Sequence, residues 1–205
     1  FGVLGTGDVG KQIGSKLISL GHEVMLGSRT ANNPKSLDWV KLNGKKAKCG
    51  TFKDAAKFGE VIFDCIQGIH SNEGLNLAGK ENLNGKILIV LANPYIFDPT
   101  QFQVSLHHDL SNTTSLGEET QKLFPKVKVV KTLDTIPYHI MVNPDLLPEQ
   151  CSVFVSSNDQ EAKTFVIKLL KDFGWKEPID LGDLTACRYT EALGASWVPF
   201  YKKYG

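Results

Sequence analysis

Apolar and polar positions alternate with two different periods along the first half of the chain. Short apolar runs typical of strands occur at FGVLG (1–5), EVML (23–26), KAKC (46–49), VIFDCI (61–66) and ILIVLA (87–92). Between the first two runs, Val9, Ile13, Leu17 and Leu20 recur at helical spacing and predict a helix over 8–20. Further helices are predicted over 34–43, where Asn33 can cap the helix and Pro34 starts it, and over 53–58. This alternation predicts parallel strands joined by crossover helices.

The second half continues the pattern after a long irregular stretch. Residues 93–114 are polar and without clear period, which predicts a long, functional loop. A helix over 115–124 follows, then strands within 126–133, 151–157 and 176–182, an amphipathic helix ended by Gly174, and a last helix from about Asp183. We therefore expect a Rossmann-type doubly wound α/β fold with a mostly parallel sheet. The chain is expected to divide into residues 1–133 and a smaller α/β portion, 134–205, packed on the first.

Composition excludes several classes of function. The chain has 205 residues, with 23 Lys+Arg against 22 Asp+Glu, so its formal charge of +1 offers no general field for nucleic acid or an anionic membrane. The longest apolar run is far shorter than the ~20 residues of a membrane span. Four cysteines without a C-x-x-C pair predict reduced thiols and a cytoplasmic protein. Phe1 already lies in a strand pattern, so we expect residues to precede it.

A glycine loop joins the first strand to the first helix. Gly5-Thr6-Gly7-Asp8-Val9-Gly10 fits G-x-G-x-x-G between a strand and an amphipathic helix, which is the context that a dinucleotide site requires. Gly5 would allow the tight turn, Gly7 the approach of a pyrophosphate, and Gly10 the close packing of helix on strand. We predict that Gly5, Thr6, Gly7, Asp8 and Val9 hold the pyrophosphate at the helix N-terminus, with the Asp8 carboxylate turned away from it.

The second strand ends at Ser28-Arg29, where NAD enzymes place an acidic residue against the adenosine ribose. No Asp or Glu stands there. A guanidinium and a hydroxyl suit a 2′-phosphate instead, so the sequence predicts NADP(H). Lys35 could assist, although a solvated surface lysine is the commoner role. An arginine at a turn can equally be a surface residue without a ligand.

The nicotinamide is expected beyond the fourth and fifth strands, near Ile66, Gln67, Ala92, Asn93 and Pro94. No catalytic acid or base is predicted from the sequence. His139 could be catalytic, although a core or loop histidine is more common. The run His107-His108-Asp109 suggests a metal site, but we expect adjacent side chains to diverge, and no ligand with i,i+4 spacing accompanies them. We therefore predict no metal centre.

Several segments together give the chain a family resemblance. GTGDVGKQIGSKLISLGHEVMLGSR, VVKTLDTIPYHIMVNP, NDQEAK and DFGWKEPIDLGDLTACRYTE, in this order, resemble the NADP oxidoreductases that depend on the deazaflavin coenzyme F420, and related bacterial dinucleotide-binding proteins. The cytosolic domains of six-transmembrane metalloreductases share the same plan. The resemblance implies hydride transfer between NADP(H) and a deazaflavin or flavin, with Thr135, Ile136 and Pro137 beside the acceptor. It also implies a homodimer.

The sequence departs from the family in places, and other functions stay open. Residues 98–112 differ from the archaeal deazaflavin enzymes. Asp134 stands where many bacterial relatives have asparagine, and Asn33 stands where archaeal relatives have a basic residue. Trp197, Phe200 and Tyr201 could cover the acceptor, form a dimer face, or pack on the core. Glu191 is interpreted as structural, paired with Arg188 or a loop. A β-hydroxyacid dehydrogenase would need a larger helical domain, and a non-catalytic NADP(H) sensor is the main alternative.

Overall fold

The computed structural model describes residues 1–204. A sheet of eight strands in the order β10-β9-β8-β5-β4-β1-β2-β3 forms its centre. All neighbouring strands run parallel except β8 and β9, which are antiparallel. The strands of this sheet are β1 (Gly2–Leu4), β2 (Val24–Ser28), β3 (Ala47–Thr51), β4 (Val61–Asp64), β5 (Ile87–Val90), β8 (Lys128–Thr132), β9 (Phe154–Ser157) and β10 (Ile179–Asp180).

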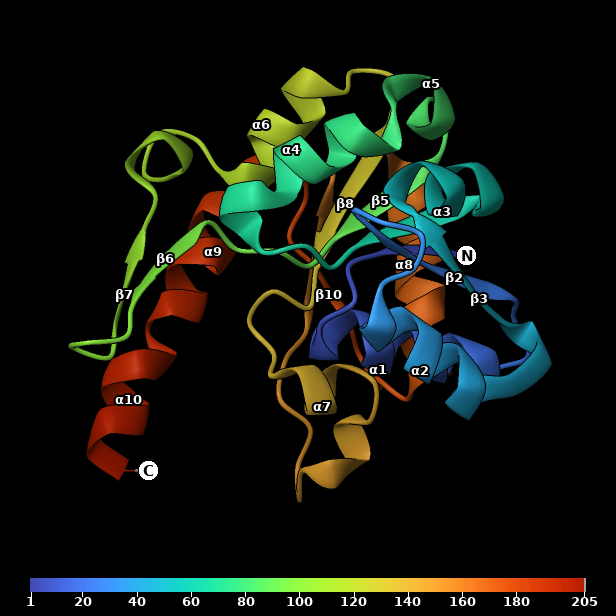
Figure 1. The fold of residues 1–205 in the computed structure, drawn as a ribbon. Helices are drawn as coiled ribbons and strands as arrows, with labels where there is room; N and C mark the ends of the chain where they lie inside the picture. Colours follow the sequence, from blue (N-terminus) through green and yellow to red (C-terminus); the bar gives the residue numbers. More distant parts are fainter. Residues whose placement is uncertain (205) are drawn as a thin grey trace.

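Helices cover both faces of the sheet (Figure 1). One face carries α3 (Phe52–Phe58), α4 (Gly68–Ala78), α5 (Lys80–Leu83) and α6 (Leu116–Leu123). The other carries α1 (Asp8–Ser19), α2 (Pro34–Asn43), α7 (Tyr138–Met141) and α8 (Gln160–Phe173). Strand residues alternate between the two layers: Val3 packs with α1, and Leu4 with α3 and α4. The expected doubly wound, mostly parallel α/β architecture is confirmed.

A hairpin and the C-terminal helices extend from one end of this sheet (Figure 1). The hairpin pairs β6 (Tyr95–Asp98) with β7 (Gln103–Leu106), and beside it lie α9 (Cys187–Ala195) and α10 (Trp197–Tyr204). The edge-on contacts of Phe102 with Phe97 and Trp197 join the hairpin to α10. Short 3-10 turns occupy 44–46, 108–110, 144–146 and 184–186.

Two segments differ from the sequence prediction. The hairpin β6–β7 stands where residues 93–114 were expected to form an irregular loop. In β6 the apolar residues Tyr95, Ile96 and Phe97 stand in a row, and β7 alternates over only four residues, so no period-two pattern long enough to identify a hairpin was present. Helices α4 and α5 were not predicted, because Gly68–Ala78 is rich in glycine, asparagine and serine and buries mainly small side chains. The predicted helix over 34–43, its Asn33 cap, and the left-handed Gly174 cap agree with the structure.

The C-terminal third shares the central sheet with the rest of the chain. A boundary near residue 133 falls between β8 and β9, which are neighbours in that sheet. The division into parts 1–133 and 134–205 stays a prediction. Among residues 1–204, no helix is both long and apolar enough to cross a bilayer.

Candidate functional site

A cavity of about 920 Å³ lies at the carboxyl ends of β1, β2, β4 and β5. The loops after these strands supply most of its lining, which is the position where doubly wound folds bind ligands. Eleven of the twelve residues predicted to bind cofactor line it; Pro94 does not. The eleven are Gly5, Thr6, Gly7, Asp8, Val9, Ser28, Arg29, Ile66, Gln67, Ala92 and Asn93.

In the glycine loop, backbone atoms form part of the cavity wall. Gly5 has a φ of +123°, a conformation that favours glycine, and its N–H donates to Gly27 O at 2.9 Å. A Cβ on Gly10 would run into the Gly5 carbonyl oxygen, whereas a Cβ on Gly7 would meet no atom within 4 Å. The glycine at Gly10 therefore serves packing, and that at Gly7 leaves space in front of the first turn of α1. That space and the helix N-terminus suit a pyrophosphate.

The end of β2 presents a cation to the same cavity. The Ser28 side chain is buried; its hydroxyl donates to Thr30 O at 2.5 Å and holds the turn that carries Arg29. Within residues 1–204, no carboxylate forms an ion pair with Arg29. Thr30 and Asn33 also line the cavity and were not predicted to do so, since Asn33 was interpreted only as a helix cap. The arrangement suits a phosphate monoester.

A buried carboxylate supports the loop after β4. Asp64 accepts hydrogen bonds from Ile66 N at 3.1 Å and from the Ser71 hydroxyl. Burial raises the pKa of Asp64 to about 6, and the two hydrogen bonds and Lys131 only partly oppose this rise. The hydrogen bond to Ile66 fixes the backbone where Ile66 and Gln67 enter the cavity.

A second cavity of about 590 Å³ lies between the C-terminal helices α9 and α10 and the segments 135–136 and 151–154. Its lining is mainly apolar and aromatic and includes Thr135 and Ile136, two of the three residues expected beside the acceptor, together with Trp197, Phe200 and Tyr201. Pro137, the third predicted acceptor residue, is exposed and lies outside both cavities. Trp197 lines both cavities. Its role in the first was missed, because only the folded chain brings α10 next to the loops of the sheet.

Charged side chains are buried behind the β5 end of the first cavity. Lys131 Nζ lies 3.0 Å from Glu191 Oε1, and its ammonium also donates to the Ala92 carbonyl. Glu191 accepts hydrogen bonds from the backbone N–H groups that begin α6. Arg188 instead pairs with Glu118, so the expected pairing of Glu191 with Arg188 was wrong; the partners of Glu191 are Lys131 of β8 and the start of α6, not a loop. The signal for this cluster in the sequence was Lys131, which directly follows Val129 and Val130 within the strand-like run 126–133.

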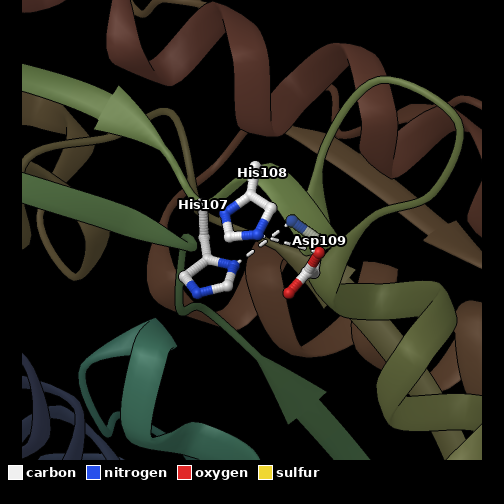
Figure 2. A group of neighbouring side chains, drawn as sticks. All are labelled: His107, His108 and Asp109. Atoms are coloured by element: carbon white, nitrogen blue, oxygen red, sulfur yellow. Dashed lines mark hydrogen bonds and ion pairs between the residues drawn. The ribbon is translucent and has the colours of Figure 1, made fainter.

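None of the three residues of the histidine run lines either cavity. Figure 2 shows their side chains grouped together, with dashed lines between them. The rings of His107 and His108 stack at 4.9 Å, so the expected divergence of these side chains is wrong. His108 Nε2 lies 3.1 Å from Asp109 Oδ1, and one ligand atom of each of the three residues lies within 4.8 Å of the others. His108 and Asp109 are largely exposed, and His107 Nδ1 accepts a hydrogen bond from Asp109 N. The run has no part in the site described above.

Known proteins resemble this chain over most of its length. The family described as NADP oxidoreductase, coenzyme F420-dependent, matches residues 1–94. A solved structure from Arthrobacter sp. FB24, named as a candidate F420-dependent NADP-reductase, is 39% identical with a TM-score of 0.89; the match covers 98% of this chain and 92% of that one. The chain belongs to the F420-dependent NADP oxidoreductase family.

Two curated proteins are also similar to this chain. The F420-dependent NADP reductase of Methanocaldococcus jannaschii is 28% identical over 98% of this chain and 91% of its own length. Metalloreductase STEAP3 of Rattus norvegicus is 30% identical over 98% of this chain, but the chain spans only 37% of that protein. Membership of the F420-dependent family confirms the predicted enzyme class, an NADP-dependent oxidoreductase, and the predicted cofactor, NADP(H).

Proposed function

We propose that the protein transfers hydride between NADP(H) and a deazaflavin of the coenzyme F420 type or a flavin. The observation that carries this proposal is the pair of cavities that meet at Trp197. The first cavity has the backbone and cation expected for NADP(H), and the second is apolar, aromatic and open to a planar ring system. Relatives named F420-dependent NADP reductases support the deazaflavin, and the metalloreductase relatives bring the flavin into consideration.

Each predicted residue has a role in this proposal. The loop Gly5–Val9 binds the pyrophosphate, and Ser28 and Arg29 receive the 2′-phosphate. Ile66, Gln67, Ala92 and Asn93 surround the nicotinamide, with Pro94 behind them. Thr135, Ile136 and Pro137 lie toward the acceptor, where Pro137 would contact only a ligand that extends beyond the cavity.

Alignment does most of the catalytic work in this reaction. When bound, NADPH supplies a hydride directly to a ring atom of the acceptor, so no protein group has to move a proton in that transfer. The chain's part is to hold two rings in contact and to exclude water between them. Trp197 and Ile136 provide apolar surface for this where the cavities meet.

The test is the oxidation of NADPH by the purified protein, followed by its absorbance, with deazaflavin, FMN, FAD and ferric chelates offered in parallel. Turnover with the deazaflavin or with a flavin is expected, and the preferred acceptor assigns the subclass. Turnover with a ferric chelate alone would contradict a ring acceptor. Tight NADPH binding without turnover on any acceptor would overturn the proposal in favour of an NADP(H) sensor.

We also propose a cytoplasmic homodimer. The four cysteines are all unpaired thiols within the described residues, as expected in a reducing compartment. An exposed aromatic stripe along α9 and α10 supports the dimer.

A further inference from the structure

Three buried charged side chains form a cluster of one lysine and two carboxylates. The lysine pairs closely with only one of the two carboxylates. The side chains of Lys131, Asp134 and Glu191 are each at most 2% exposed. Lys131 Nζ lies 3.0 Å from Glu191 Oε1 but 4.0 Å from Asp134 Oδ2. One cation therefore faces two anions, and the closer pair is the one with Glu191.

The two carboxylates differ in the hydrogen bonds that stabilise their charge. Glu191 also accepts hydrogen bonds from Leu116 N at 3.0 Å and Gly117 N at 3.2 Å. Asp134 Oδ2, by contrast, has no hydrogen-bond partner among the described residues. A third carboxylate nearby, Asp64, has its own hydrogen-bond donors. The charge of Asp134 is thus the least neutralised of the group, and water screens a buried charge little.

Two hydrogen bonds connect this cluster to the cofactor cavity. Lys131 donates to the carbonyl of Ala92, and Asn93 Nδ2 donates to the backbone carbonyl of Asp134 at 2.5 Å. Ala92 and Asn93 both line the cavity at the end of β5. The backbone of Asp134 therefore contacts the cavity wall, and its carboxylate lies 4.0 Å from the Lys131 ammonium, which bonds to the same wall behind the place proposed for the nicotinamide.

We propose that Asp134 sets the redox preference of the cofactor site by stabilising the oxidised, positively charged nicotinamide over the neutral reduced one. This inference rests on the proposed function. Loss of a hydride, which carries two electrons and one proton, leaves the nicotinamide ring with one positive charge, and the acceptor gains that hydride. A buried anion behind the ring favours the charged form. The site therefore holds NADP⁺ more tightly relative to NADPH, and this favours hydride donation from NADPH.

The test compares the Kd values of NADP⁺ and NADPH in the wild type and in Asp134→Asn. Asparagine keeps the shape and the backbone carbonyl but removes the charge. We expect the ratio of Kd(NADP⁺) to Kd(NADPH) to rise about tenfold, which for a two-electron couple corresponds to about 30 mV toward a higher potential of the bound cofactor. Calorimetry measures both constants without turnover. Asp134→Ser is the second variant if the asparagine protein fails to fold.

Asp8→Asn is the matched control, because it removes an equal charge at the other end of the same cavity. We expect it to change both Kd values by the same factor, since the phosphates of the two cofactor forms are identical. An unchanged ratio in Asp134→Asn, or an equal loss of both forms, would overturn the proposal and leave Asp134 with a structural role only. If the wild type binds neither form, the proposed NADP(H) site itself fails.

Discussion

Arg29 is the residue on which the choice of NADP(H) over NAD(H) depends. It lines the cavity, and no carboxylate within residues 1–204 forms an ion pair with it, so its guanidinium is available to a 2′-phosphate. We expect Arg29→Ala to weaken NADPH binding by about 1.5–3 kcal/mol, the range for a hydrogen bond to a charged group, and to leave NADH binding nearly unchanged. Fluorescence titration with both nucleotides measures this.

Lys35→Ala is the control for this variant, because Lys35 is exposed and does not line the cavity. It should change the binding free energy of either nucleotide by no more than about 0.5 kcal/mol, as is usual for a surface substitution. An equal loss of NADPH and NADH in Arg29→Ala would refute the role of Arg29 at the 2′-phosphate.

Asp64 makes the stability of the fold depend on pH. Its folded pKa of about 6 lies above its ordinary value of 3.8, so the folded state holds the proton more tightly than the unfolded chain. The contribution of Asp64 to the free energy of unfolding should therefore be most favourable below about pH 4, fall as the pH rises to about 6, and change little above that. The gap of about two pH units corresponds to about 3 kcal/mol.

Urea denaturation between pH 4 and 7 measures this effect as the difference between the wild type and Asp64→Asn. Asparagine cannot titrate, so the decline in that window should be about 3 kcal/mol smaller in the variant. The same slope in both proteins would show that other groups cause the pH dependence. The sequence could not predict this pH dependence. An aspartate at the end of a strand pattern gives no sign that it will be fully buried or that Ser71 will lie opposite it.

At the scale of elements, two glycines in the loop between β1 and α1 have different roles, one in helix packing and the other in cofactor binding. We expect Gly10→Ala to lower the free energy of unfolding by about 1–3 kcal/mol, because its methyl group would press on the Gly5 carbonyl. Gly7→Ala should leave stability within about 1 kcal/mol but weaken NADPH binding about tenfold or more, because its methyl group enters the space in front of α1.

Thermal unfolding and NADPH titration of the two variants distinguish these roles. If Gly7→Ala binds NADPH as the wild type does, the pyrophosphate does not lie against this loop. If Gly10→Ala is as stable as the wild type, then the helix does not depend on this close approach.

The same comparison shows what the sequence can predict at this scale. The G-x-G-x-x-G spacing and the flanking periods located β1, α1 and the turn between them, because local sequence determines that turn. The hairpin β6–β7 and α4 had no such periodic signal. They depend on packing against α10, α3 and α6, which are distant in sequence. For the same reason, Trp197 and Tyr95 were absent from the predicted cofactor site, although both line the cavity.

At the scale of the whole molecule, one face of α9 and α10 carries apolar and aromatic side chains that are about half or more exposed. Tyr189, Leu193, Trp197, Phe200 and Tyr204 follow one another at helical spacing and are exposed by 75%, 53%, 46%, 63% and 73%. An exposed apolar stripe of this kind is typical of an interaction surface. Four of its members also line the second cavity. A second copy of the chain on this face would therefore cover the acceptor as well as bury the aromatic side chains.

We expect Phe200→Glu to convert the proposed homodimer into a monomer. A buried aromatic anchor contributes about 2 kcal/mol or more to an interface, so its replacement by a charge should weaken dimerisation at least about thirtyfold. Light scattering after size-exclusion chromatography measures the mass. Leu42→Glu is the control, because Leu42 is 85% exposed on α2, away from the stripe, and should leave the dimer intact.

The monomeric variant should keep its Kd for NADPH yet lose turnover, since the cover over the second cavity is gone. A wild type that is monomeric at micromolar concentration would contradict the dimer, and full turnover by a monomeric Phe200→Glu protein would show that each chain completes its acceptor site alone.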